Sequence, residues 1–252
     1  LDGDIDKDGP GYYLSTAWAG KNASAGRGVA TWLEVIEADS VAEGMEVAKY
    51  CPQPTLCFMF ADSQGNIGMQ GCGHFPIRRR FHDGLVPLPA WDSENHWRGF
   101  LSKEFLPSIY NPPQGFVATA NEAVNPPEGP WLVTQPVPDY RKRRIVECLQ
   151  DIPAATIQDM QEIQYDFVSL QARDLLEIFL PYLDDGEFKS RLQAWDCRYD
   201  TNSHEASLFQ HFYINVIIQV FGQDDAIGWR RVLYLCSRCG YSAMVLNAAD
   251  QL

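Results

Sequence analysis

Apolar and polar residues follow different patterns in the two halves of the chain. Up to about residue 135, apolar residues occur in short runs of the kind that form strands. Residues 55–62 form an apolar run, residues 63–66 are polar, and residues 67–70 are apolar again. This pattern predicts a buried antiparallel hairpin whose polar residues are confined to its turn.

Two more strands are predicted in this half. One is residues 12–20, where aromatic and aliphatic residues alternate with small polar ones. The other is residues 111–121, in which a double-proline turn and a glycine lead into an apolar stretch that ends in an amide, Asn121. Taken alone, this second stretch is typical of a strand that closes on a turn-forming asparagine.

Two helices are predicted between these strands. Apolar residues at three-and-four spacing predict a helix at 30–38, and a second helix at 41–48 follows Ser40, a good N-cap. Trp18 and Trp32 are expected to pack in the core.

Beyond residue 135 the period becomes helical. A basic amphipathic helix is predicted at 140–150, and a longer helix, capped by Thr156, is predicted to end at Leu180. Two more helices are predicted at 206–221 and 226–235. The chain is therefore predicted to be α+β, with a strand-rich segment at 1–135 and a helical segment at 136–252.

Charge narrows the classes of partner. The chain has 20 Lys and Arg against 33 Asp and Glu, a net charge of -13. Such a balance argues against nucleic acid and against a broad anionic membrane surface. No apolar run approaches the roughly 20 residues that span a bilayer. We expect no nucleic-acid partner and no membrane span.

Several candidate sites have a structural interpretation that we favour. Asp4, Asp6 and Asp8 begin a calcium-loop pattern, but its twelfth position is Ser15 instead of a glutamate, which favours a solvated acidic turn. Residues 78–80 are three arginines, either an anion clamp or partners of nearby carboxylates, and the second interpretation is favoured.

The cysteines do not indicate a disulfide framework. There are seven, an odd number, so an obligatory disulfide scaffold is not expected, and the redox compartment stays open. Cys236 and Cys239 lack the second ligand pair of a zinc site and the strand that precedes a redox pair, so we interpret them as structural thiols. No Gly-x-Ser-x-Gly elbow and no zinc-protease helix is present.

Ordered motifs run through both halves of the chain. They are ADSQGNIG at 61–68, GHFPIR at 73–78, PLPAW at 87–91, WRG at 97–99, NPPQGFVATAN at 111–121, YR and RI at 140–145, QYD at 164–166 and WD at 195–196. In this order the motifs resemble the penicillin acylase (penicillin amidase) family. The resemblance extends from about residue 12 to about residue 221.

The resemblance implies a fold and an activity. Members are N-terminal-nucleophile hydrolases with a four-layer αββα sandwich, made by self-cleavage of a precursor. They hydrolyse linear amides such as acylated β-lactam side chains or N-acyl homoserine lactones, and they require no cofactor. The nucleophile is the hydroxyl of the first residue of the larger chain, and its own α-amino group, with a pKa near 8, serves as base. The resemblance also implies a periplasmic or secreted protein.

The resemblance assigns two catalytic candidates. Asn121 matches the asparagine whose side-chain amide holds the tetrahedral oxyanion, and Arg144 matches the arginine near the active centre. Glu122 departs from the family, which commonly has a second asparagine there. A carboxylate pointing inward would oppose an oxyanion, so either Glu122 faces away or the site is altered, and Arg144 is a candidate partner for it. Arg144→Ala is accordingly expected to impair turnover more than folding.

Other family features are incomplete in this sequence. Some members bind a structural calcium through a carbonyl at the position of Gly84, but the segment gives no support for the metal. Leu1 has neither hydroxyl nor thiol, so the nucleophile is expected to lie elsewhere. We expect the chain to be a central segment of the β-chain region, one larger domain truncated at both ends, inactive alone and partnered by the α chain and the rest of the β chain.

Two other functions remain open. A non-catalytic relative that binds acyl ligands is allowed by Glu122 and by the missing nucleophile, and so is a purely structural segment. Acyl specificity cannot be fixed from this sequence; the apolar residues 56–60 suggest only an apolar acyl group.

Overall fold

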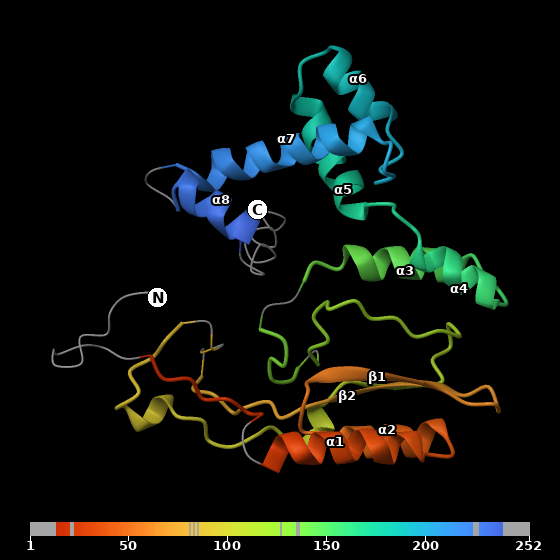
Figure 1. Cartoon of the computed structure of the whole chain (residues 1–252), viewed down its shortest axis with the longest axis vertical. Coiled ribbons are helices and arrows are strands. Elements are labelled where there is room, and N and C mark those ends of the chain that lie inside the picture. The colour runs from red at the N-terminus through yellow and green to blue at the C-terminus, as the bar shows by residue number, and fades with distance from the viewer. Residues whose placement is uncertain are drawn as a thin grey trace. The chain divides into compact units, whose positions relative to one another are not determined.

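A computed structural model gives the fold of the chain (Figure 1). It describes residues 14–20, 23–80, 82, 84, 86–126, 128–134, 137–223 and 227–238. The chain divides into two compact units, residues 1–117 with 124–134 and residues 118–123 with 135–252. The predicted acidic turn at 4–9 and Cys239 lie outside the described residues.

The first unit is built on a three-stranded antiparallel sheet. Its strands are β1 (Leu56–Ala61), β2 (Ile67–Cys72) and β3 (Ser108–Tyr110), in the order β1-β2-β3. The predicted hairpin is confirmed, with Leu56 opposite Cys72. Its turn is fixed by Asp62, whose carboxylate accepts hydrogen bonds from the backbone N–H groups of Gln64 and Asn66. The central strand, β2, is the buried one.

Two helices cover one face of this sheet (Figure 1). They are α1 (Ala23–Ile36) and α2 (Val41–Lys49). Ser40 caps α2 as predicted, since its hydroxyl accepts from the N–H of Glu43 at 3.2 Å. Met45 of α2 lies directly over Gly68 of β2, where a Cβ would come within 2.4 Å of the sulfur. The missing side chain therefore lets the helix approach the strand.

Three predictions for this half are wrong. The helix α1 begins at Ala23, seven residues before the predicted start, because the small residues of the supposed loop are tolerated in a helix. Residues 14–18 form no strand, and Trp18 and Trp32 are 64% and 44% exposed.

The predicted strand at 111–121 is also wrong. The short strand β3 precedes it, and residues 116–120 are irregular. A strand needs a hydrogen-bonded neighbour, and among the described residues none pairs its backbone with residues 116–120.

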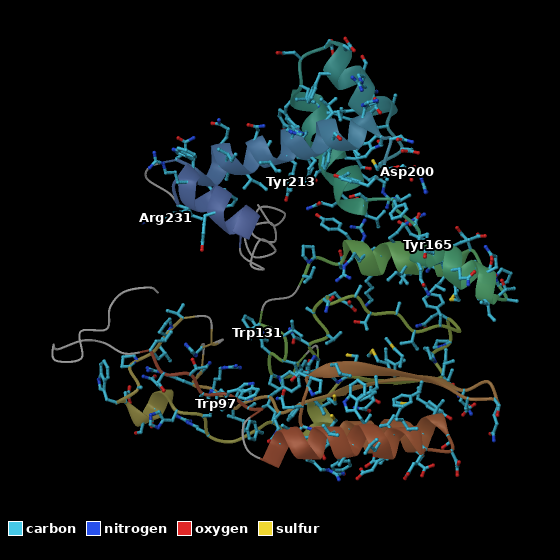
Figure 2. The ribbon with its side chains drawn as sticks, viewed as in Figure 1. Trp97, Trp131, Tyr165, Asp200, Tyr213 and Arg231 are labelled. Atoms are coloured by element: carbon cyan, nitrogen blue, oxygen red, sulfur yellow. The ribbon has the colours of Figure 1, made fainter. Side chains whose placement is uncertain are left out.

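The second unit is helical. Its helices are α3 (Tyr140–Gln150), α4 (Ile157–Gln164), α5 (Leu170–Phe179), α6 (Glu187–Ala194), α7 (His204–Phe221) and α8 (Trp229–Arg238), with short 3-10 turns at Ser93–Asn95 and Lys103–Phe105 in the first unit and at Leu180–Tyr182 in the second. The core lies between α5, α6 and α7, where Leu176, Leu192 and Phe209 are buried. Tyr213, labelled on α7 in Figure 2, belongs to the same core.

Sequence patterns predicted much of this unit. The helix α3 has the predicted ends, and Thr156 caps α4 in a capping box with Asp159. The predicted long helix is instead two helices, because residues 167–169 leave the helical path and pair with residues 197–199. Helix α6 was not predicted, α7 begins two residues early, and α8 begins at Trp229.

The distribution of elements agrees with an α+β chain. All three strands found in the described residues lie before residue 111, and six of the eight α-helices there follow residue 139. No helix in the described ranges has both the length and the apolar character needed to cross a membrane.

Candidate active site

Asn121 stands at the end of an irregular loop in the second unit. Its backbone is in the left-handed region, with φ of +72°. Asparagine tolerates this conformation better than most residues that have a Cβ. The side chain is exposed, so the turn presents an amide at the surface of this unit.

Arg141, in the first turn of α3, holds this amide in one orientation. Its Nη2 donates to the Asn121 Oδ1 at 2.5 Å and to the carbonyl oxygen of Ala120 at 2.8 Å. The backbone N–H of Val137 donates to the Asn121 carbonyl at 3.1 Å. A guanidinium can only donate, so the amide oxygen faces Arg141 and the amide nitrogen faces away. Among the described residues no group accepts a hydrogen bond from that nitrogen.

Glu122, the next residue, is buried and turns back on the loop. Its side chain is 8% exposed. The Oε2 accepts from the N–H of Ala120 at 2.7 Å and from the Thr119 hydroxyl at 3.1 Å, and the Oε1 lies 2.9 Å from Lys142 Nζ. Burial raises the pKa of Glu122, but the Ala120 N–H and Lys142 outweigh it, so its pKa lies below the ordinary value.

Arg144 is engaged elsewhere. Its Nε and Nη2 donate to the carboxylate of Asp166, at 2.5 and 3.3 Å, and its Nη1 donates to Glu147 at 3.1 Å. The expected pairing of Arg144 with Glu122 is wrong, because Lys142 occupies that place. The arginine that contacts Asn121 is instead Arg141, which the sequence analysis did not single out.

The basic start of α3 is a sequence signal by which Arg141 could have been found. Cationic side chains in the first turn of a helix oppose its dipole, which makes four in succession unfavourable unless each has a partner. Arg141 faces two neutral oxygens, Lys142 faces Glu122, and Arg143 pairs with Asp174. Of these three cations, only Arg141 has no carboxylate partner among the described residues.

A cavity of about 610 Å³ lies beside this helix. Its lining includes Arg141 and Arg144, and apolar walls come from Ile145, Ile163 and Leu170. The volume is in the range of small-molecule sites. Tyr165, labelled in Figure 2, lies just beyond the end of α4.

The arginines at 78–80 and the possible metal site were the other candidates from the sequence. Arg79 donates to the Asn95 side chain at 3.0 Å and lies 4.0 Å from Asp92, in agreement with local pairing. Trp131, labelled in Figure 2, lines a cavity of about 530 Å³ together with residues 78–80. Within the described part of the chain no three His, Cys, Asp or Glu residues converge on a point that could hold a metal.

Four cysteines of the described residues are free thiols, namely Cys51, Cys72, Cys148 and Cys197. Burial raises the pKa of Cys72 to about 12, so its thiol is protonated at neutral pH. Cys236 lies in α8, and Cys239 lies outside the described residues.

Comparison with solved structures identifies the class of fold. A thermostable penicillin G acylase from Alcaligenes faecalis superposes with a TM-score of 0.64 at 19% sequence identity, over 91% of this chain and 51% of that chain. The chain thus shares its fold with part of that acylase. The sequence model of the penicillin amidase family matches residues 3–247, and the chain belongs to that family.

Curated relatives agree with this assignment. The penicillin acylase 2 proenzyme of Pseudomonas sp. (strain SE83) is 35% identical over 157 residues, which are 60% of this chain and 20% of that protein. The acyl-homoserine lactone acylase QuiP of Pseudomonas syringae pv. syringae is 26% identical over 249 residues, 89% of this chain and 30% of that protein. The chain spans between a fifth and a third of the length of these relatives.

Proposed function

We propose that this chain supplies the oxyanion-binding loop of an amidohydrolase that cleaves the linear amide of an N-acylated small molecule, such as an acylated β-lactam or an N-acyl homoserine lactone. The observation that carries the proposal is the amide of Asn121, whose oxygen is held by Arg141 and whose nitrogen is left free to donate. The nucleophile and its α-amino base come from a segment outside this chain, as the short span of the chain along its relatives suggests.

Each residue then has a defined part in the reaction. The nucleophile's hydroxyl oxygen attacks the amide carbonyl carbon while its proton passes to the α-amino group, and the carbonyl oxygen becomes an oxyanion. The Asn121 amide N–H donates to that oxyanion. The α-ammonium proton then goes to the leaving amine as the C–N bond breaks. Water hydrolyses the acyl-enzyme in the reverse sense and releases the carboxylic acid.

An amide suits this task because it is already fixed in place. A donor that needs no reorganisation when charge develops contributes most to the rate. Here Arg141 fixes the side-chain oxygen, and Val137 fixes the backbone carbonyl of the same residue. The guanidinium lies behind the amide, on the side of its oxygen, and its hydrogen bond polarises the amide so that the N–H is a stronger donor.

 
Arg144 has a supporting role in this reaction, weaker than the catalytic role that the family resemblance implies. Its contacts with Asp166 and Glu147 favour a supporting role, in which Arg144 anchors α3 and thereby the position of Arg141. We therefore place Asn121 and Arg141 at the reaction and Arg144 behind them.

The sequence and the family also bear on the acyl group, the partners and the location of the enzyme. The apolar side chains of β1 favour an apolar acyl group. The partners are the remaining segments of a processed precursor, and the family suggests a periplasmic or secreted protein.

Two measurements test the proposal. Mass spectrometry of the mature protein is expected to find a chain that begins with Ser, Thr or Cys, and this protein is expected to hydrolyse a chromogenic acyl anilide. Absence of both would leave a non-catalytic acyl-binding relative or a structural segment. If the processed Asn121→Ala variant hydrolyses the anilide as well as the wild type does, the proposed role of the loop is rejected.

A further inference from the structure

Glu122 has an unusual position for a carboxylate beside a proposed oxyanion site. It adjoins Asn121 in sequence, and only 8% of its side chain is exposed. A buried charge is costly unless it is paired and hydrogen-bonded. Glu122 meets both conditions, with two hydrogen bonds to one oxygen and an ion pair to the other.

The partners of this carboxylate surround Asn121 in the sequence. The N–H of Ala120 and the hydroxyl of Thr119 come from the two residues before Asn121, and Lys142 follows Arg141 on α3. The carboxylate therefore closes a turn across Asn121. This is the residue whose φ of +72° is uncommon for a side chain with a Cβ.

The two basic residues at the start of α3 hold the same turn from two sides. Arg141 binds the carbonyl oxygen of Ala120 and the side-chain oxygen of Asn121, whereas Lys142 binds Glu122. Both polar backbone groups of Ala120 are thus occupied, the N–H by Glu122 and the carbonyl by Arg141. Little freedom remains for the peptide that precedes Asn121.

We propose that Glu122, neutralised by Lys142, is a positioning residue that fixes the left-handed turn at Asn121 and so aims its amide at the oxyanion. The expected effect of Glu122 on the rate rests on the proposed function, whereas its expected effect on the turn does not. Glu122 itself touches no reacting atom. Its charge is balanced by Lys142, so it does not oppose the oxyanion as an unpaired carboxylate would.

The test uses the full-length, processed protein with two substitutions of Glu122. Glu122→Met removes the acceptor and the charge, whereas Glu122→Gln keeps an acceptor for the Ala120 N–H. We expect kcat to fall on the order of 10-fold in Glu122→Met, and less in Glu122→Gln, with KM unchanged. Glu147→Met is the matched control, because Glu147 pairs with Arg144 and Arg173 and does not contact the loop.

Hydrogen exchange provides a second readout that needs no activity. The Ala120 amide is expected to exchange on the order of 10-fold faster in Glu122→Met than in the wild type, and to keep its protection in Glu147→Met. Unchanged Ala120 exchange in Glu122→Met would overturn the inference, as would equal kcat in the Met variants of Glu122 and Glu147. If the wild type does not hydrolyse the acyl anilide, the proposed function fails, and Ala120 exchange still decides whether Glu122 fixes the turn.

Discussion

Two arginines one turn apart on α3 have contrasting surroundings. Arg141 donates to two neutral oxygens, those of Ala120 and the Asn121 side chain. Arg144 donates to two carboxylates, Asp166 and Glu147. The charge of Arg144 is therefore balanced locally, whereas Arg141 keeps a positive charge beside a free amide. An arginine that faces neutral oxygens is the better candidate for stabilising an anion, because no carboxylate balances its charge.

The contacts of the carboxylates complete this contrast. Asp166 also lies 3.5 Å from Arg198, and Glu147 receives a second hydrogen bond from Arg173. These pairs tie α3 to α5 and to the segment before α7. Removing a member of this network should change stability, while removing Arg141 should change the orientation of one amide. The following predictions test that difference.

The largest effect is expected for Asn121→Ala. Loss of one oxyanion donor typically lowers kcat by about 100- to 1,000-fold. Because the Asn121 side chain is exposed, the unfolding free energy should change little. Steady-state kinetics and denaturant unfolding measure the two quantities. Asn215→Ala on α7, where the side chain donates only to His211 of its own helix, serves as the control. A kcat within a few-fold of that control would refute the assignment of Asn121.

Arg141→Met should have the next largest effect on rate. The substitution leaves the Asn121 side chain without its anchor, and a displaced catalytic group can cost up to about 100-fold. We expect kcat to fall between about 10- and 100-fold with KM little changed. Arg191→Met, which removes an exposed pair with Glu205, is the matched control. If Arg141→Met behaves like Arg191→Met, the free amide does not depend on Arg141.

Arg144→Met should affect stability instead of turnover. It removes hydrogen bonds to a carboxylate that is only 13% exposed, at a cost of about 2 kcal/mol. Urea unfolding monitored by circular dichroism measures this loss, and kcat is determined at a temperature where the variant is folded. This outcome reverses the expectation from the sequence that Arg144 acts mainly on turnover. A large fall in kcat with unchanged stability would restore that expectation.

Local patterns in the sequence were reliable where neighbouring residues decide the structure. The ends of α3, the cap of α4 at Thr156 and the β1–β2 hairpin depend on residues within a few positions, and all three were predicted. The predicted strand at 111–121 failed for the opposite reason. Its apolar residues favour a strand, but a strand also requires a partner, which no local pattern specifies.

The candidate site shows the same limit. Asn121 and the neighbouring Glu122 were singled out from motif and charge, but their partners lie about twenty residues away on α3. Spacing along a helix shows that Arg141 and Arg144 are neighbours, but it does not show to which oxygen each arginine donates a hydrogen bond. The choice between them needed the positions of the Asn121 loop and of Asp166.

The smallest effect is expected in the pH dependence of stability. Hydrogen bonds from Arg144 hold the pKa of Asp166 below its ordinary value, although burial opposes them. A carboxyl whose pKa is lower in the folded state stabilises the fold above its unfolded pKa of about 3.9, and this contribution disappears as the pH falls through the lowered folded value.

Asp166→Asn should therefore reduce the unfolding free energy most near pH 7, by about 1 kcal/mol or somewhat more, and progressively less below about pH 4. Urea unfolding of the wild type and of Asp166→Asn between pH 3 and pH 7 measures the difference. A deficit of equal size at both ends of this range would mean that the ionisation of Asp166 does not stabilise the fold. Arg144 would then have to be held in place by Glu147, and the contrast with Arg141 would rest on that single carboxylate.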